Sequence, residues 1–183
     1  LKKMIHDACK KEEYHTLVVG LGNRDVTPDA LGPRVVDNLF ITRHMVKEYG
    51  KYAFGEERVN SISGLVPGVM AQTGMESLEI IKGVVNQTKP DFIITIDALA
   101  ARSTKRLGCT IQLTDTGIVP GSGVGNHRNR ISHENIGVPV ISIGIPTVID
   151  AVTIVSDAVN ANRDMTEKLM SPKLNGMFVT PKD

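Results

Sequence analysis

The sequence predicts a three-layer α/β fold, in which a mostly parallel central sheet lies between two layers of helices. Three observations lead to this prediction. Short apolar runs at residues 16–20, 92–96 and 138–143 are typical of buried parallel strands. Segments with the apolar spacing of helices alternate with these runs along the chain. No repeat or linker interrupts the 183 residues, so we expect a single domain over residues 1–183.

The remaining elements follow from the same spacing and from the positions of glycine and proline. Further strands are predicted at residues 59–62 and 110–113, and helices at residues 1–13, 33–47, 76–85, 147–161 and 163–170. The central strand ends at Asp97, and a turn or short helix follows at residues 98–102. Residues 116–135 form a glycine-rich loop that is unusually long for a compact domain, and such loops are often functional.

The composition is that of an ordinary globular domain, with 41% hydrophobic and 22% charged residues and a net charge of +1. Because Lys and Arg are scattered, we expect no nucleic-acid interface. The chain has no run of 18 apolar residues and no signal-peptide core, so we expect no membrane association. Cys109 lies in an apolar run, which predicts a buried thiol in a reducing compartment such as the cytoplasm.

Two acidic residues are the strongest candidates for chemistry. Asp29 follows the first strand, and Asp97 ends the central strand. The carboxyl ends of parallel strands form one rim of a sheet, where ligands bind in open α/β folds. If the two strands are neighbours, the carboxylates lie close enough to share a proton and to activate a water molecule. The alternative is that each aspartate caps a helix or a turn.

Several residues near these acids are supporting candidates. Asn23 and Thr73 are placed to orient the acid pair, although Thr73 also fits the start of the next helix. Asp115 follows the strand at residues 110–113. His127 is a candidate base or metal ligand, but no HxH or HxxxH spacing accompanies it, and the alternative is a solvated loop histidine.

The long loop and its surroundings also contain candidates for contacting a substrate. These are Arg102, Asn126 and Arg128. Together with Arg130, the two arginines either bind an acidic peptide or keep the loop soluble.

No cofactor site is predicted. Gly20-Leu-Gly-Asn matches part of a dinucleotide fingerprint, but the third glycine is out of register and no acidic residue ends a second strand at the required distance. A tight turn explains these glycines instead. Ser122 lacks the GxSxG sequence of a nucleophile elbow.

Five blocks of sequence carry a more specific signal. They are GLGNRDVTPDALGP (20–33), PGVMAQTGME (67–76), IDALAARS (96–103), DTGIVPGSGVGN (115–126) and GVPVISIGIPTVIDA (137–151). In this order, between Leu17 and Val155, they resemble the germination protease family of spore-forming Firmicutes. The resemblance implies an endopeptidase that cuts small acid-soluble spore proteins during germination, in the cytoplasm of the spore core.

The resemblance also implies properties of the site and of the assembly. Family members are made as zymogens, form homotetramers and are thought to use two aspartates in an atypical aspartic mechanism. The aspartate of the TPDALG motif corresponds to Asp29, and that of the IDALAAR motif corresponds to Asp97. The family's N-terminal region with its pro-segment and its C-terminal continuation are missing, so we expect a core fragment that need not be active alone.

The fold is also similar to that of hydrogenase-maturation proteases, within a phosphorylase/hydrolase-like arrangement. Their glycine-asparagine turn and second strand-end aspartate bind a metal ion, but no position here clearly matches their histidine ligand. A metal-dependent protease is therefore one alternative. A non-catalytic relative that binds peptides at the sheet edge is another.

Overall fold

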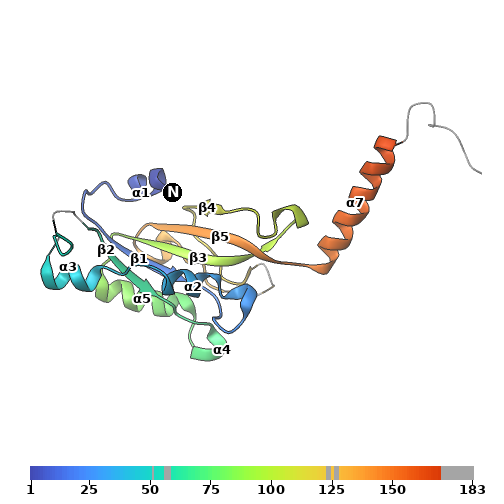
Figure 1. Ribbon diagram of the computed structural model, residues 1–183. Coiled ribbons are helices and arrows are strands. Elements are labelled where there is room, and N and C mark those ends of the chain that lie inside the picture. Colours follow the sequence, from blue (N-terminus) through green and yellow to red (C-terminus); the bar gives the residue numbers. More distant parts are fainter. Residues whose placement is uncertain (51, 56–58, 123–124, 126–127, 170–183) are drawn as a thin grey trace, which may run out of the picture.

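The computed structural model describes residues 1–169 except 51, 56–58, 123–124 and 126–127, and it gives residues 163–169 as helical backbone only. Its centre is a five-stranded sheet with the strand order β2-β1-β3-β5-β4 (Figure 1). The strands are β1 (His15–Gly20), β2 (Ser61–Leu65), β3 (Phe92–Ala101), β4 (Gln112–Thr114) and β5 (Val140–Ile149). All neighbours are parallel except β4, which pairs antiparallel with β5. The predicted mostly parallel α/β sheet is confirmed.

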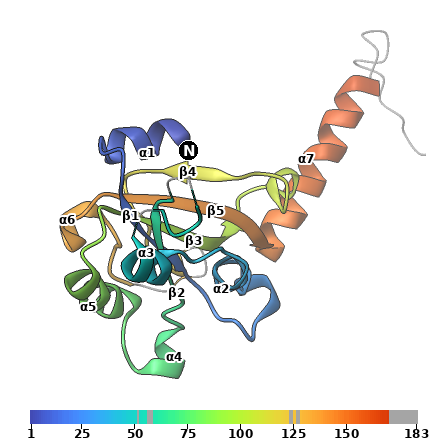
Figure 2. The same cartoon turned by 60° about the vertical axis from the view of Figure 1, so that its left-hand side comes forward.

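Helices cover both faces of this sheet and complete the predicted three layers. They are α1 (Lys2–Ala8), α2 (Leu31–Asp37), α3 (Arg43–Tyr49), α4 (Met70–Thr73), α5 (Ser77–Thr88), α6 (His133–Ile136) and α7 (Ala151–Leu169), with 3₁₀ turns η1 (Thr27–Asp29) and η2 (Thr104–Arg106). Helix α7 projects away from the sheet, as both views show (Figures 1 and 2). No helix in the described part of the chain is long and apolar enough to cross a bilayer.

Alternate residues of the strands form the two halves of the core. On one face, Leu17, Val19 and Ile93 pack with Ile81 and Val85 of α5, and α6 lies on the same side. The opposite face buries a second cluster, which includes Phe92 and Ile141 and is covered by the apolar side of α1. This alternation follows from the pleat, because successive side chains of a strand point to opposite faces.

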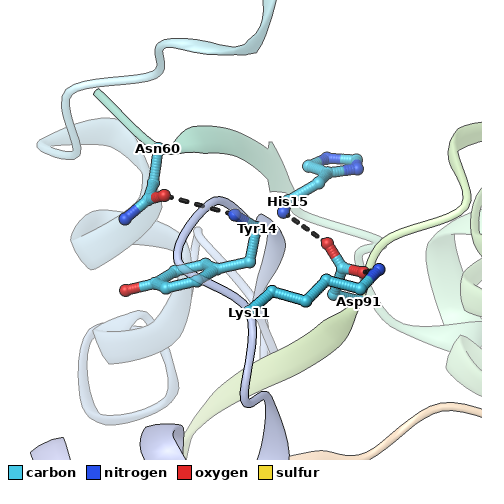
Figure 3. A network of polar contacts seen from close by, with 5 residues as sticks. All are labelled: Lys11, Tyr14, His15, Asn60 and Asp91. Atoms are coloured by element: carbon cyan, nitrogen blue, oxygen red, sulfur yellow. Dashed lines mark hydrogen bonds and ion pairs between the residues drawn. The ribbon is translucent and has the colours of Figure 1, made fainter. Parts of the chain in front are cut away.

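A polar network fixes the amino-terminal ends of three parallel strands at one level (Figure 3). Asp91, just before β3, accepts hydrogen bonds from the Lys11 ammonium group and from the backbone N–H of His15. Asn60, just before β2, accepts one from the backbone N–H of Tyr14. Burial raises the pKa of Asp91, but the hydrogen bonds from Lys11 and His15 outweigh burial and hold that pKa below its ordinary value. The carboxylate therefore stays charged and aligns β1 with β3.

The boundaries of several elements differ from the predictions. The single helix predicted at residues 33–47 is two helices, because the buried Thr42 interrupts it. The Thr42 hydroxyl donates to the carbonyl of Asn60 and accepts from the N–H of Ile62, which ties the bend to β2. The strand predicted at 59–62 begins and ends later, at residues 61–65, and the helix predicted at 147–161 begins only at Ala151.

Strands β3 and β5 are both longer than predicted. They pair with each other as far as Ala101 and Ile149, so residues 98–102 are not a turn and β5 continues past residue 143, through Pro146. Within residues 116–135, a bridge joins Ile118 to Ile131 and α6 begins. The prediction for Cys109 was wrong, because this residue is exposed in the turn before β4.

The backbone comes very close to itself where α2 crosses the end of β1. A Cβ atom at Gly20 would lie 2.2 Å from the carbonyl oxygen of Gly32, and a Cβ atom at Gly32 would lie 2.4 Å from the carbonyl oxygens of Ile96 and Leu21. Only glycine fits at either position. The two glycines bring the loop after β1 directly onto the sheet.

We therefore expect Gly20→Ala to lower the free energy of unfolding by at least ~2 kcal/mol, because a backbone oxygen cannot move aside as a flexible side chain can. Gly83 is the matched control, since it is exposed on α5 with open space around its Cβ position. Gly83→Ala should raise the free energy of unfolding by ~0.5–1 kcal/mol. Urea unfolding of both variants checks this, and equal stability of the two would contradict the close approach.

Candidate active site

Asp97 lies in the interior of β3, beside the point where its neighbour ends. The last residue of β1, Gly20, pairs with Ile96, so Asp97 is the first residue of β3 that has no partner on that side. On the other side it pairs with Gly144 of β5. Its side chain is only 5% exposed. The prediction that Asp97 ends its strand was wrong, but the adjacent strand does end there.

Asp29 reaches the same place through the loop that continues from β1. The N–H of Leu21 donates to the carbonyl of Ile96, which keeps the chain against β3 for one more residue. The chain then turns through Gly22, at φ +111°, where a Cβ atom would lie 2.1 Å from the carbonyl oxygen of Asp29. The backbone N–H of Asn23 donates to the Asp29 carboxylate at 2.6 Å. The loop therefore folds back on itself and places Asp29, the last residue of η1, on the side of Asp97.

The surroundings of Asp97 favour its protonated form. Burial raises its pKa most, the nearby Asp29 carboxylate raises it further, and a hydrogen bond from the N–H of Ala98 partly opposes both. The result is a shift from the ordinary value of 3.8 to about 7. A carboxyl group with this pKa exchanges its proton readily near neutral pH, which is what a general acid or base requires.

Both aspartates line a cavity of about 1070 Å³ at the carboxyl end of the sheet. Its wall includes residues of α4, the start of α5 and the segment around Pro120. Three arginines also line it, namely Arg102, Arg106 and Arg128. A cavity of this size accommodates several residues of an extended peptide. Its lining combines the three arginines with four acidic residues, because Glu76 and Asp150 line it together with Asp29 and Asp97.

Of the other predicted residues, Asn23 contacts the pair directly, and it does so through its backbone. Its side-chain oxygen accepts hydrogen bonds from the N–H of Asp25 and from Gln72 of α4. Thr73 has local partners instead: its hydroxyl donates to the carbonyls of Val69 and Met75 at the end of α4. The structure does not bring Thr73 to the acids.

The remaining predicted residues divide into three groups. Arg102 and Arg128, predicted to contact a substrate, line the cavity. Asp115 is exposed and lies outside the cavity lining, while Arg130 donates to the carbonyl of Thr116. Asn126 and His127 lie outside the described residues.

The structure adds residues that the sequence patterns did not single out. Glu76 forms a capping box with Glu79 at the start of α5, and its carboxylate also accepts hydrogen bonds from Asn129, which fixes the cavity wall to that helix. The ExxE spacing at a helix start was an available signal for this. Beneath Asp97, the buried hydroxyl of Thr95 donates to Ser142 at 2.8 Å.

A metal site was one alternative for this rim. Among the described residues, no group of three or more His, Cys, Asp or Glu side chains lies together as metal ligands would. The candidate ligand His127 lies outside the described residues.

Comparison with known proteins agrees with the sequence blocks. A family model described as germination protease matches residues 1–175. The chain belongs to the germination protease family. Germination proteases of Caldanaerobacter subterraneus subsp. tengcongensis and Priestia megaterium are 59% and 58% identical to it over 133 and 132 residues. These alignments cover 73% and 72% of this chain.

The germination protease of Bacillus subtilis is 58% identical over 127 residues, or 69% of this chain. The matched segments make up only 40%, 35% and 34% of the three relatives, so the chain spans well under half of their length. Among solved structures, the NiFe hydrogenase maturation protease HycI from Thermococcus kodakarensis matches 91% of this chain and 99% of its own, with 18% identity and a TM-score of 0.44.

The raised pKa of Asp97 predicts how stability depends on pH. The folded chain binds a proton at Asp97 up to about pH 7, whereas the unfolded chain loses it near pH 3.8. The stabilising contribution is therefore fully present below pH 3.8 and is lost as the pH rises to about 7. Asp97→Asn, which stays neutral, should be more stable than wild type by ~2–4 kcal/mol at pH 8 and nearly equal to it near pH 4.

Urea unfolding of the chain between pH 4 and pH 8 measures this difference. Asp7→Asn provides a matched control, since Asp7 lies exposed on α1, away from the cavity. It should leave the pH dependence of the wild type unchanged. A parallel pH dependence of Asp97→Asn and wild type would show that Asp97 ionises at its ordinary pKa.

Proposed function

We propose that the chain is the catalytic core of a peptidase in which Asp29 and Asp97 act as a pair. The observation that carries this proposal is the location of both acids on one cavity, with the pKa of Asp97 raised to about 7 by burial and by Asp29. A buried acid beside a second acid is the arrangement that allows one group to donate a proton while the other accepts one.

In this mechanism, the two carboxyl groups hold a water molecule against the scissile peptide bond. Asp29 removes a proton from the water, whose oxygen attacks the peptide carbonyl carbon, and Asp97 donates its proton to the carbonyl oxygen. The tetrahedral intermediate then breaks its C–N bond as a proton passes from Asp29 to the leaving nitrogen, and one hydroxyl proton of the intermediate returns to Asp97, which restores both acids. Asn23 supports Asp29 throughout, because its backbone N–H donates to one carboxylate oxygen and leaves the other for the water.

We propose small acid-soluble spore proteins as the substrates, cut during germination in the spore core. The family membership supports this role, and the size of the cavity suits an extended peptide segment. Synthesis as a zymogen, assembly as a homotetramer and a cytoplasmic location are further parts of the proposal, which the family resemblance supports.

The first test removes each acid in the complete native polypeptide. Asp29→Asn and Asp97→Asn should each lower kcat by several orders of magnitude on a small acid-soluble spore protein, and the double variant should be hardly worse, because the pair works as a unit. Asp7→Asn should cleave at the wild-type rate. Substantial cleavage by either single variant would exclude the paired mechanism.

The same assay separates the alternatives. A metal-dependent protease would lose its activity in a chelator and recover it with a divalent cation, whereas the acid pair should be insensitive to both. A non-catalytic relative would bind the spore protein, as gel-shift or fluorescence anisotropy would detect, without cutting it even as the wild type.

Although Glu76 and Asp150 also line the cavity, the neighbouring arginines at one end of it predict a local preference for an acidic residue of the peptide. Arg102 and Arg106 both lie on the lining near the end of β3. Replacing either by Gln should raise KM for a peptide with Glu or Asp near the cut by roughly threefold to tenfold, with a smaller effect on a neutral peptide. The difference should shrink at high ionic strength.

Lys82→Gln serves as the matched control for this loss of one positive charge. Lys82 is exposed on α5 and lies outside the cavity lining. Equal increases in KM for the acidic and the neutral peptide in the arginine variants would remove the basis for an acidic preference.

A further inference from the structure

Strand β5 contains a bulge close to the acid pair. Pro146 pairs with Leu99 and Val148 pairs with Ala100, so Thr147 is an extra residue on β5 with no partner on β3. Proline cannot donate to a ladder, and bulges often accompany it. On the other side of β5, the carbonyl of Pro146 accepts a hydrogen bond from the N–H of Gly108, which fixes the strand at the bulge.

The bulge changes the direction of Thr147. With regular pairing, Thr147 would lie opposite Ala100 in the ladder, but Val148 takes that position instead. The Thr147 hydroxyl donates to the backbone carbonyl of Pro28 at 2.6 Å. Pro28 is the central residue of η1, directly before Asp29. A contact between residues 119 positions apart thus joins β5 to the turn that carries one of the two acids.

The segments on either side of η1 are held against β3 by the hydrogen bond from Leu21 to Ile96 and by the close backbone approach of Gly32 to Ile96. The hydrogen bond from Asn23 to Asp29 lies within the same loop, so it shapes the loop without fixing it to the sheet. The Thr147 bond, in contrast, links η1 to a strand that pairs with β3 through Asp97 itself, opposite Gly144. Bulges next to active sites commonly redirect a side chain in this way.

We propose that the bulged Thr147 is a positioning residue, whose hydroxyl holds η1, and with it Asp29, at the working distance from Asp97. This inference rests on the proposed roles of Asp29 and Asp97. Thr147 takes no part in proton transfer. Because small displacements of a catalytic group lower the rate steeply, the loss of one such bond should affect turnover more than binding.

Thr147→Val tests the proposal in the complete native polypeptide, since it removes the hydroxyl and keeps the shape of the side chain. We expect kcat on a small acid-soluble spore protein to fall roughly tenfold with KM nearly unchanged. Thr147→Ser restores the hydroxyl and should recover the wild-type kcat to within about twofold. If the Ser variant is as impaired as the Val variant, the hydroxyl is not what positions Asp29.

Thr88→Val is the matched control. The Thr88 hydroxyl also donates to a backbone carbonyl, that of Val84 at 2.8 Å, but it lies at the far end of α5. This variant should keep both kcat and KM.

A second measurement is independent of turnover. ¹³C NMR titration of the Asp97 carboxyl group should give a lower pKa in Thr147→Val than in wild type, because a displaced Asp29 raises that pKa less. The Ser and Thr88→Val variants should titrate like wild type. An unchanged titration together with unchanged kcat in Thr147→Val would overturn the positioning role.

The two proposals fail in different ways. If Asp29→Asn and Asp97→Asn still cleave, the paired mechanism is wrong whatever Thr147 does. If both are inactive while Thr147→Val behaves like wild type in turnover and titration, the mechanism stands and only the role of Thr147 is lost.

Discussion

The early end of β1 is the constraint on which the candidate site depends. In a parallel sheet, a residue in the middle of a long strand is normally flanked by ladder partners on both sides. Because β1 stops at Gly20, Asp97 has such a partner only on β5, and the space on its other side is open to the loop that continues from β1. That loop carries Asp29. The end of β1 therefore leaves Asp97 without a ladder partner on one side and, through the loop that follows, places Asp29 beside it.

The close contacts around this point serve the same arrangement. Gly20 and Gly32 allow α2 to cross the end of β1 at backbone distance, and Gly22 lets the loop fold back over Asp29. Larger side chains at these positions would lift the loop away from the sheet. The burial of Asp97 follows from this tight closure, and burial is the largest cause of its raised pKa. The buried carboxyl group therefore lowers the stability of the fold at a position that apolar side chains would ordinarily fill.

Much of this architecture could be predicted from the sequence. The apolar runs at residues 16–20 and 92–96 mark buried strands because a strand covered on both faces needs apolar side chains throughout. The lengths of β3 and β5 could not be predicted, since Asp97 and Pro146 are residues that usually end strands. Their continuation depends on pairing between two segments about 50 residues apart, which local pattern does not encode.

The candidate site could also be predicted only in part. We predicted that Asp29 and Asp97 meet because each follows the end of a strand. They do meet, but only β1 ends at this point, while β3 continues past Asp97. Thr73 was expected beside the acids, but its hydrogen bonds are local because α4 ends there. Nothing in the sequence pattern pointed to Thr147, because the direction of a side chain at a bulge is set by the register of its partner strand.

The network around Asp91 gives the sheet unequal ends. At the amino-terminal end, backbone and side-chain hydrogen bonds hold β1, β2 and β3 in line (Figure 3). At the other end, β3 and β5 are the strands of the described chain that continue as a pair. Thermal fluctuations of the backbone should therefore grow along the strands, from a stiff base toward a compliant rim. The rim that carries Asp29 and Asp97 therefore depends less on strand pairing than the base does, and more on the loop contacts around Gly20, Gly22 and Gly32.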